Sequence, residues 1–393
     1  MKYDFDSVIN RRETDSLKWH IGENELPMWV ADMDFQAAPE ILEGIRERLD
    51  HGIFGYPVIT DKWYDAYGSW WSERHGFYMK KEALIFCAGV IPAVSSLVRA
   101  FTEPGANVLI QPPVYNAFFG IIRGNGRAVQ ENPLIYRDGV YKMDFDDLER
   151  KMSDPKTKLM ILCNPHNPTG NIWSREDLKT VGELAKKLGV TVISDEIHCD
   201  LTEPGRGYIP FASASDVCAD VGISCIAPTK AFNLAGLKTS AVYVSNPELR
   251  EAVKKAFAVD ELSEPNAFAE VAAVTAFERG GEWLDELRRV VSQNRKRTED
   301  FLQEELPQIK AVRGEATYLV WLDLTGLKGD ASGFGAFLRS RTGLFLSPGK
   351  IFGEQGSCFL RMNIACPQKI LKDGLSRLKA GAGEWNKTEA EIR

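Results

Sequence analysis

Two short motifs hold residue types that suit joint chemistry. The first is Asp-Glu-Ile-His at residues 195–198, and the second begins Thr-Lys and spans residues 229–238. Each motif follows a short apolar run that reads as a buried strand. An acid and a lysine at two strand ends suit an enzyme that holds a pyridine cofactor. Asp195 would keep the ring nitrogen protonated, while Lys230 would form a Schiff base and later take the Cα proton of a substrate.

A third motif, Asn-Pro-His-Asn-Pro-Thr-Gly at residues 164–170, also follows a buried run. Its prolines and glycine predict a turn. Asn167 in that turn is placed to donate an amide hydrogen bond to an oxygen on the ring. His198, three residues after Asp195, is expected near the same oxygen, although a single histidine often has only a structural role.

A phosphate site is predicted where residues 88–92 end one strand and open a helix. The free N–H groups and the dipole of a helix start attract anions. Lys238 suits a phosphate anchor that lies close to the catalytic lysine in sequence. The residues expected around the phosphate are Gly89, Val90, Ile91, Thr229 and Lys238.

Three further residues complete the predicted site. Tyr115 follows the next strand, where its ring would stack on the pyridine face; packing alone is the alternative role. Tyr56 lies outside the main sheet and is expected to reach a phosphate across a dimer interface. Arg361 stands in an apolar strand, where a buried arginine needs an anion, either a structural partner or a substrate carboxylate held bidentately. Asn167 and Tyr115 are expected to contact the substrate as well.

Composition excludes several other functions. The net charge of -7 argues against nucleic-acid binding, and no apolar run approaches the roughly 20 residues of a membrane span. The start of the chain shows no secretory pattern. Seven cysteines without a Cys-x-x-Cys pair favour a reducing compartment, so a cytoplasmic protein is expected. Five scattered histidines predict no metal site, and no Gly-x-Gly-x-x-Gly or Walker motif is present.

From about residue 82 to 246, apolar runs alternate with helix-length amphipathic segments, which predicts a mainly parallel sheet covered on both faces. The expected strands are 84–87, 108–111, 159–163, 190–194, 223–227 and 241–244. The expected helices include 92–102, 175–188 and 247–257.

Beyond about residue 280 the pattern predicts a smaller α+β domain. Its expected elements are helices 282–305, 331–339 and 368–378, the segment 316–322 and strand 358–364, with a frayed tail from residue 385. We therefore predict a large cofactor-binding domain at 49–280. The small domain would combine 1–48 with 281–393.

Taken in order, these residues resemble the fold-type I pyridoxal 5′-phosphate (PLP) enzymes of the class I/II aminotransferase superfamily over essentially the whole chain. Three motifs, at 29–35, 195–198 and 232–238, resemble its carbon–sulfur lyase branch, the cystathionine β-lyase/cysteine desulfhydrase group of the MalY/PatB type. The resemblance implies an α/β fold with a seven-stranded, mainly parallel sheet. It also implies a homodimer with shared active sites.

Three departures from the wider aminotransferase pattern bear on this assignment. His198 stands where many aminotransferases have a tyrosine, and Lys238 where many have an arginine; both agree with the lyase branch. Ala227 replaces a serine often found three residues before the lysine. One phosphate contact is therefore either missing or supplied by Thr229.

The resemblance implies a PLP-dependent carbon–sulfur β-lyase of amino-acid metabolism. Its substrate would be L-cystathionine or another cysteine S-conjugate, which α,β-elimination converts to a thiol or sulfide, pyruvate and ammonia. Two alternatives stay open: an aminotransferase that uses the same site, and an enzyme with an added role in binding a transcription regulator. The preferred conjugate, the pathway and the acid that protonates the leaving thiolate also stay open.

Overall fold

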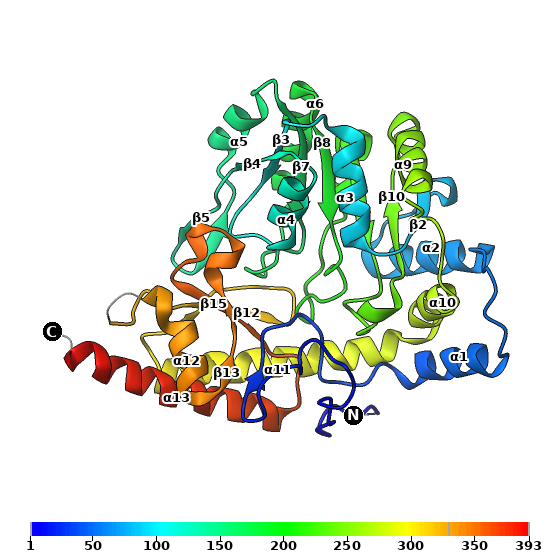
Figure 1. Ribbon diagram of the computed structural model, residues 1–393. Coiled ribbons are helices and arrows are strands. Elements are labelled where there is room, and N and C mark those ends of the chain that lie inside the picture. The colour runs from blue at the N-terminus through cyan, green and yellow to red at the C-terminus, as the bar shows by residue number, and fades with distance from the viewer. Residues whose placement is uncertain (1, 329–330, 392–393) are drawn as a thin grey trace.

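A seven-stranded sheet forms the centre of this computed structural model, which describes residues 2–328 and 331–391 (Figure 1). The strand order is β2-β10-β9-β8-β7-β3-β4. Strands β4, β3, β7, β8 and β9 pair in parallel, and β10 runs antiparallel between β9 and β2. The mainly parallel α/β sheet is confirmed. The strands are β2 (Leu84–Cys87), β3 (Asn107–Ile110), β4 (Ala128–Glu131), β7 (Thr157–Cys163), β8 (Thr191–Asp195), β9 (Gly222–Ile226) and β10 (Ser240–Tyr243).

Helices cover both faces of this sheet, which is why its strands are continuous apolar runs. In β7, Leu159 and Ile161 face the layer of helices α3 (Val90–Phe101) and α9 (Pro247–Val259). The intervening Met160 faces the opposite layer. Helices α5 (Phe145–Met152), α6 (Arg175–Leu188) and α8 (Asp216–Val221) form that second layer.

Helix α6 has the predicted bounds because both ends carry strong local signals. The Ser174 side chain accepts from the backbone N–H of Asp177, and the Asp177 carboxylate accepts from the N–H of Ser174 in return. This reciprocal capping satisfies N–H groups that the first turn cannot pair. Gly189 ends the helix with φ of 66°, a left-handed conformation that glycine adopts without strain.

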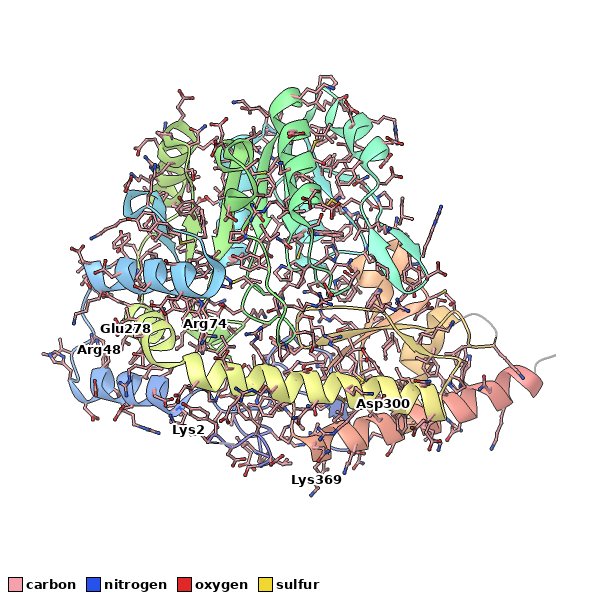
Figure 2. All side chains as sticks on the ribbon, turned by 180° about the vertical axis from the view of Figure 1, so that it is seen from behind. Lys2, Arg48, Arg74, Glu278, Asp300 and Lys369 are labelled. Atoms are coloured by element: carbon pink, nitrogen blue, oxygen red, sulfur yellow. The ribbon has the colours of Figure 1, made fainter. Side chains whose placement is uncertain are left out.

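A second, antiparallel sheet has the order β11-β12-β15-β14 and lies beside long helices. Its strands are β11 (Lys310–Ala311), β12 (Leu319–Asp323), β14 (Ser347–Pro348) and β15 (Phe359–Asn363), with helices α11 (Gly281–Glu305), α12 (Phe334–Thr342) and α13 (Gln368–Glu391). Figure 2, seen from behind, shows α11 crossing the base of the molecule next to α13. The N-terminal strand β1 (Leu26–Pro27) pairs with β13 (Leu344–Phe345), which brings the start of the chain to this part.

The remaining elements connect these parts. They are α1 (Pro39–Asp50), α2 (Asp61–His75), α4 (Ala117–Gly124), α7 (Phe211–Ala214), α10 (Ala269–Arg279), β5 (Ile135–Arg137), β6 (Val140–Lys142) and the 3-10 turns η1 (Lys81–Ala83), η2 (Ala235–Leu237), η3 (Ala331–Gly333), η4 (Gly349–Phe352) and η5 (Glu354–Gly356). Among the described residues, no helix combines the length and apolarity that a membrane crossing requires.

Two predictions about elements were wrong. Helix α13 continues from the predicted end near residue 378 to Glu391, because Trp385 packs edge-on against Phe334 and Phe337 of α12 at 5.6 and 5.1 Å. The tail is therefore helical where fraying was expected, and residues 392–393 lie outside the described part. Strand β4 was missed because only its first two residues, Ala128 and Val129, are apolar and the strand is incompletely buried at the sheet edge.

Trp321 offers a test of the packing between the second sheet and its surroundings. Its ring is 1% exposed, stacks on Phe359 at 5.1 Å, and its Nε1 donates to the Tyr141 hydroxyl at 3.2 Å. Trp321→Ala should lower the free energy of unfolding by about 3–5 kcal/mol through lost contacts and a cavity. Urea unfolding followed by circular dichroism measures this. Tyr78→Ala, at a side chain that is 79% exposed, is the control and should cost under about 0.5 kcal/mol. Equal effects would contradict the packing argument.

Candidate active site

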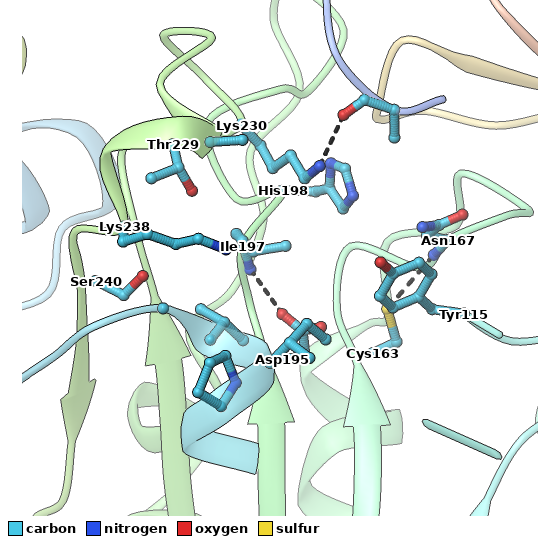
Figure 3. A pocket seen from close by; sticks show the side chains of 16 residues that line it. Tyr115, Cys163, Asn167, Asp195, Ile197, His198, Thr229, Lys230, Lys238 and Ser240 are labelled. Carbon is cyan, nitrogen blue, oxygen red and sulfur yellow. Dashed lines mark hydrogen bonds between the residues drawn. The ribbon is translucent and has the colours of Figure 1, made fainter. Parts of the chain in front are cut away.

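A cavity of about 200 Å³ opens at the carboxyl ends of the central strands, beside the start of α3 (Figure 3). Such strand ends are where ligands bind in open α/β sheets. The predicted residues that line it are Gly89, Val90, Ile91, Tyr115, Asn167, Asp195, His198, Thr229, Lys230 and Lys238. Two predicted residues, Arg361 and Tyr56, do not line this cavity.

Strand register explains how the three motifs meet. Cys163 at the end of β7 lies beside Asp195 at the end of β8, and Asp195 lies beside Cys225 of β9. The turns that follow β7 and β9 then carry Asn167 and Lys230 over the same edge. Residues far apart in the chain therefore converge because parallel strands end together.

Asp195 is a buried carboxylate that accepts few hydrogen bonds from the protein. It is 3% exposed, and its Oδ1 accepts the N–H of Ile197 at 3.2 Å. Burial raises the pKa of Asp195 to about 6, while the Ile197 N–H and the Lys230 charge act in the opposite direction. A cationic or N–H donor in the cavity would stabilise its charged form.

The Lys230 amine is buried, although the residue as a whole is partly exposed at the cavity. Its Nζ donates to the backbone oxygen of Ala31 at 2.7 Å. Burial, followed by the charge of Arg361, lowers the pKa of Lys230 to about 8, against the opposing effect of the Asp32 and Asp195 carboxylates. A lysine with such a pKa is readily deprotonated and suits a nucleophile or a base.

His198 is held neutral by its surroundings. Burial, followed by the charges of Lys230 and Arg361, lowers the pKa of His198 to about 3. Its Nδ1 is buried and has no hydrogen-bond partner in the described part of the chain. Figure 3 shows the ring beside the Lys230 amine. A neutral imidazole with a free nitrogen is suited to a hydrogen bond with a bound ligand.

Arg361 lies next to the cavity, on β15, and joins it through Asn167. Its Nη1 donates to Asn167 Oδ1 at 3.0 Å and its Nη2 donates to the backbone oxygen of Trp29 at 2.8 Å. Among the described residues it forms no ion pair, and its Nε is buried without a partner. Burial lowers the pKa of Arg361 to about 10. The structural ion pair considered from the sequence is therefore not found, and an external anion is the remaining partner for this charge.

The residues 29–35, here called the N-terminal strap, border the cavity at Ala31 and accept hydrogen bonds through their backbone oxygens. Ala31 O accepts from Lys230 and from the Tyr318 hydroxyl at 2.9 Å. Asn363 Nδ2 donates to the oxygens of Val30 and Asp32, both at 2.6 Å. The sequence identified this segment as a motif of the lyase branch but did not identify Tyr318 or Asn363 as site residues, because neither belongs to a motif.

The end of the cavity opposite Asn167 carries Lys238 together with two hydroxyls, Thr229 and Ser240 (Figure 3). The α3 N-terminus adjoins them, and its N-cap Gly89 has φ of 117°, which only glycine adopts readily. Ser240 was not predicted, because a serine at the start of an apolar strand gives no sequence signal.

The two predicted tyrosines lie in different settings. Tyr115 lines the cavity, and its ring meets Phe118 edge-on at 5.6 Å. Tyr56 is fully exposed in the segment that joins α1 to α2, away from the cavity of its own chain. Its predicted contact with a phosphate requires a second chain and stays a prediction.

These groups fit the functional groups of PLP. A buried carboxylate, a lysine of lowered pKa and an unpaired cation with hydroxyls at a helix start match a ring nitrogen, a carbonyl carbon and a phosphate. The buried, unpaired Nδ1 of His198 adds a group that a ring substituent would satisfy.

Comparison with known proteins gives concordant results. The chain is 45% identical to the cystathionine beta-lyase PatB of Bacillus subtilis (strain 168), over 96% of this chain and 99% of that protein. The structure matches cystalysin from Treponema denticola, which contains a pyridoxal 5′-phosphate cofactor, with a TM-score of 0.94, 34% identity and coverage of 98% and 100%. It matches the PLP-bound C–S lyase from Staphylococcus hominis with a TM-score of 0.91, 34% identity and coverage of 97% and 98%.

At the level of the family, residues 21–378 match the group described as aminotransferase class I and II. That span includes the strap, the central sheet and Arg361. The cofactor of the matched solved structures is PLP, as the motifs predicted. The chain therefore belongs to the class I and II aminotransferase family and is a PLP-dependent enzyme.

Proposed function

We propose that this protein is a PLP-dependent carbon–sulfur β-lyase that acts on L-cystathionine or another cysteine S-conjugate. The reaction breaks the Cα–H and Cβ–S bonds and, with one water, yields the free thiol, pyruvate and ammonium. The observation that carries this proposal is that Lys230 and Asp195 line one cavity next to Arg361, which has no acidic partner among the described residues. The 45% identity to a cystathionine beta-lyase supports the lyase over the aminotransferase.

The residues that would hold the cofactor occupy three sides of the cavity. Asp195 would hold the proton on the ring nitrogen, and Asn167 and His198 would face the ring oxygen. Lys238 and Thr229 would bind the phosphate with the start of α3 (Val90 and Ile91 included). When bound, the cofactor supplies a protonated pyridine ring that withdraws electrons from the substrate Cα.

Arg361 would bind the substrate carboxylate. Its guanidinium is already oriented by Asn167 Oδ1 and by stacking over the Phe352 ring at 4.8 Å. A planar donor fork of this kind holds a carboxylate with two parallel hydrogen bonds. Because Asn167 contacts both groups, the carboxylate and the ring would be fixed relative to each other.

Lys230 would remove the Cα proton. Its lowered pKa allows a substantial neutral fraction near pH 8, where an ordinary lysine is almost fully protonated. The strap closes one side of the cavity through Ala31 and limits access of water to this amine. His198 stays neutral and contributes hydrogen bonding without a competing charge.

A second copy of the chain is the proposed partner. The segment between α1 and α2 exposes four large apolar side chains in a short stretch, which is unusual on a free surface. Those side chains are Ile53, Phe54, Tyr56 and Val58. A homodimer would cover them and bring Tyr56 to the phosphate end of the partner's site.

The domain division and the cellular location are proposals too. The central sheet supports a large domain at 49–280, and the antiparallel sheet with β1 supports a small domain of 1–48 and 281–393. The cysteines in the described structure are free thiols, and six of the seven are buried. This supports a cytoplasmic protein, since reducing compartments keep thiols unpaired.

Lys230→Ala tests the reaction directly. With L-cystathionine and no keto acid, the wild-type holoenzyme should release pyruvate and thiol in equal amounts. The variant should lose at least about 10³-fold in kcat, because nucleophile and base are removed together. Lys255→Ala, at an exposed lysine outside the cavity, is the control and should keep wild-type activity. Product formation that depends on an added keto acid would instead identify an aminotransferase.

The pH dependence of Lys230 reactivity tests its environment. Only the neutral amine reacts, so reductive methylation of the cofactor-free protein should rise through an apparent pKa of about 8 at Lys230. Peptide mass spectrometry at a series of pH values gives this curve. A midpoint near the ordinary lysine value of about 10.4 would show that the amine is solvated and not desolvated.

Mixing two inactive proteins tests the homodimer. If Tyr56 acts across the interface, a dimer of one Lys230→Ala chain and one Tyr56→Ala chain contains one site with both residues intact. Random exchange of protomers in a 1:1 mixture should then restore up to about a quarter of the wild-type sites, since half of the dimers are mixed. Light scattering should give a mass of twice 43.9 kDa. No recovery in a mixture shown to exchange would place Tyr56 in its own chain's site or in none.

A further inference from the structure

The phosphate end of the cavity contains three polar groups that the protein leaves without partners. Lys238 Nζ, Thr229 Oγ1 and Ser240 Oγ line it, and none forms a hydrogen bond or ion pair with another residue of the described chain. Thr229 is 6% and Ser240 1% exposed. Two unpaired hydroxyls and an ammonium group that share one cavity indicate a ligand with several acceptor oxygens.

The start of α3 points to the same kind of ligand. This 12-residue helix has Gly89 as its N-cap, with no side chain that caps the first turn. The N–H groups of Val90 and Ile91 therefore lack acceptors within the helix, and both residues line the cavity. An anion at this end would accept from the helix start, from the ammonium and from the hydroxyls together.

Strand register places Ser240 opposite Ala227. At the position of Ala227, related enzymes often have a serine. β10 pairs with β9 so that Ala241 faces Ile226 and Val242 faces Cys225. One step further in the same register, Ser240 faces Ala227. Residues directly opposite on antiparallel strands project from the same face, with Cβ atoms about 4.5–5.5 Å apart. A hydroxyl on Ser240 can therefore reach the space that a hydroxyl at position 227 would occupy.

Ser240 is also held close to the helix start from its other side. It pairs with Cys87 of β2, two residues before Gly89. Figure 3 shows Thr229 and Ser240 on opposite sides of the Lys238 side chain. One hydroxyl from the turn after β9 and one from the start of β10 thus lie on either side of the Lys238 side chain.

We infer that the Ser240 hydroxyl donates a hydrogen bond to the cofactor phosphate and replaces, from the neighbouring strand, the hydroxyl that Ala227 lacks. This inference rests on the proposed PLP enzyme and extends its phosphate site to a residue outside the known motifs. The sequence left open whether one phosphate contact is missing or is supplied by Thr229. With Ser240 included, Thr229 is one of two hydroxyl donors.

The test compares binding of PLP and of pyridoxal, which lacks the phosphate, to cofactor-free protein by tryptophan fluorescence. Ser240→Ala should weaken PLP binding about 10-fold or more, the effect of one hydrogen bond to a charged group. Its affinity for pyridoxal should be unchanged. Ala227→Ser combined with Ser240→Ala should recover most of the PLP affinity, because the hydroxyl returns to the same space.

Ser96→Ala is the matched control, since it deletes a buried and unpartnered hydroxyl in α3 outside the cavity. It should leave both affinities unchanged, and circular dichroism should show all variants folded. If Ser240→Ala leaves PLP affinity unchanged, or weakens PLP and pyridoxal equally, the inference is wrong. Failure of the proposed function looks different: the wild-type protein would bind PLP but release no pyruvate from cysteine conjugates.

Discussion

Removal of charged groups from water is the constraint on which the site depends. Asp195, His198, Lys230 and Arg361 lie where the central sheet, the strap and the second sheet meet, and their burial is the first cause of their pKa changes. Each change favours the neutral form. The protein alone therefore holds an incompletely compensated set of polar groups, and a ligand with a ring nitrogen, a phosphate and a carboxylate partner supplies the missing interactions. The burial that favours binding of such a ligand is therefore also the cause of the pKa changes that make these groups reactive.

The N-terminal strap links this constraint to the rest of the fold. Lys230 and Arg361 both donate to its backbone oxygens, at Ala31 and Trp29. These are the two groups that must also meet the cofactor and the substrate. Tyr318 and Asn363 hold the same segment from the second sheet. The strap, the second sheet and the central sheet therefore meet at the reacting groups. If Lys230 or Arg361 exchanges its hydrogen bond to the strap for one to a ligand, the contacts among all three parts change.

Much of the central sheet was predictable, because fully buried parallel strands appear as continuous apolar runs. Leu84–Cys87 was predicted with its observed bounds, and the other predicted strands shift by one or two residues. β4 was not found, since a short, incompletely buried edge strand with two polar residues lacks that signal. The end of α13 was misplaced because its last turns depend on Trp385 packing against another helix, a tertiary contact that local sequence does not show.

The site residues also divide into those that the sequence predicted and those that only the fold shows. Asp195, Lys230, Asn167 and Lys238 stand in contiguous motifs, so their residue types and neighbours identified them. The contact between Arg361 and Asn167 joins positions 194 residues apart, and only the fold brings them together. Ser240, Tyr318 and Asn363 belong to strand ends without motifs, where one residue carries no recognisable pattern.

Cys163 lies in the wall of the cavity in which the proposed reaction releases a thiol. Burial, reinforced by the charge of Asp195, raises the pKa of Cys163 well above the usual cysteine value. Its Sγ donates to Pro165 O and accepts from the N–H of Asn167, which fixes it in the wall. Exchange between thiols and disulfides proceeds through the thiolate, so this sulfur is a poor nucleophile. A mixed disulfide at Cys163, which would block the cavity, is therefore disfavoured even where thiol product and its disulfides are present.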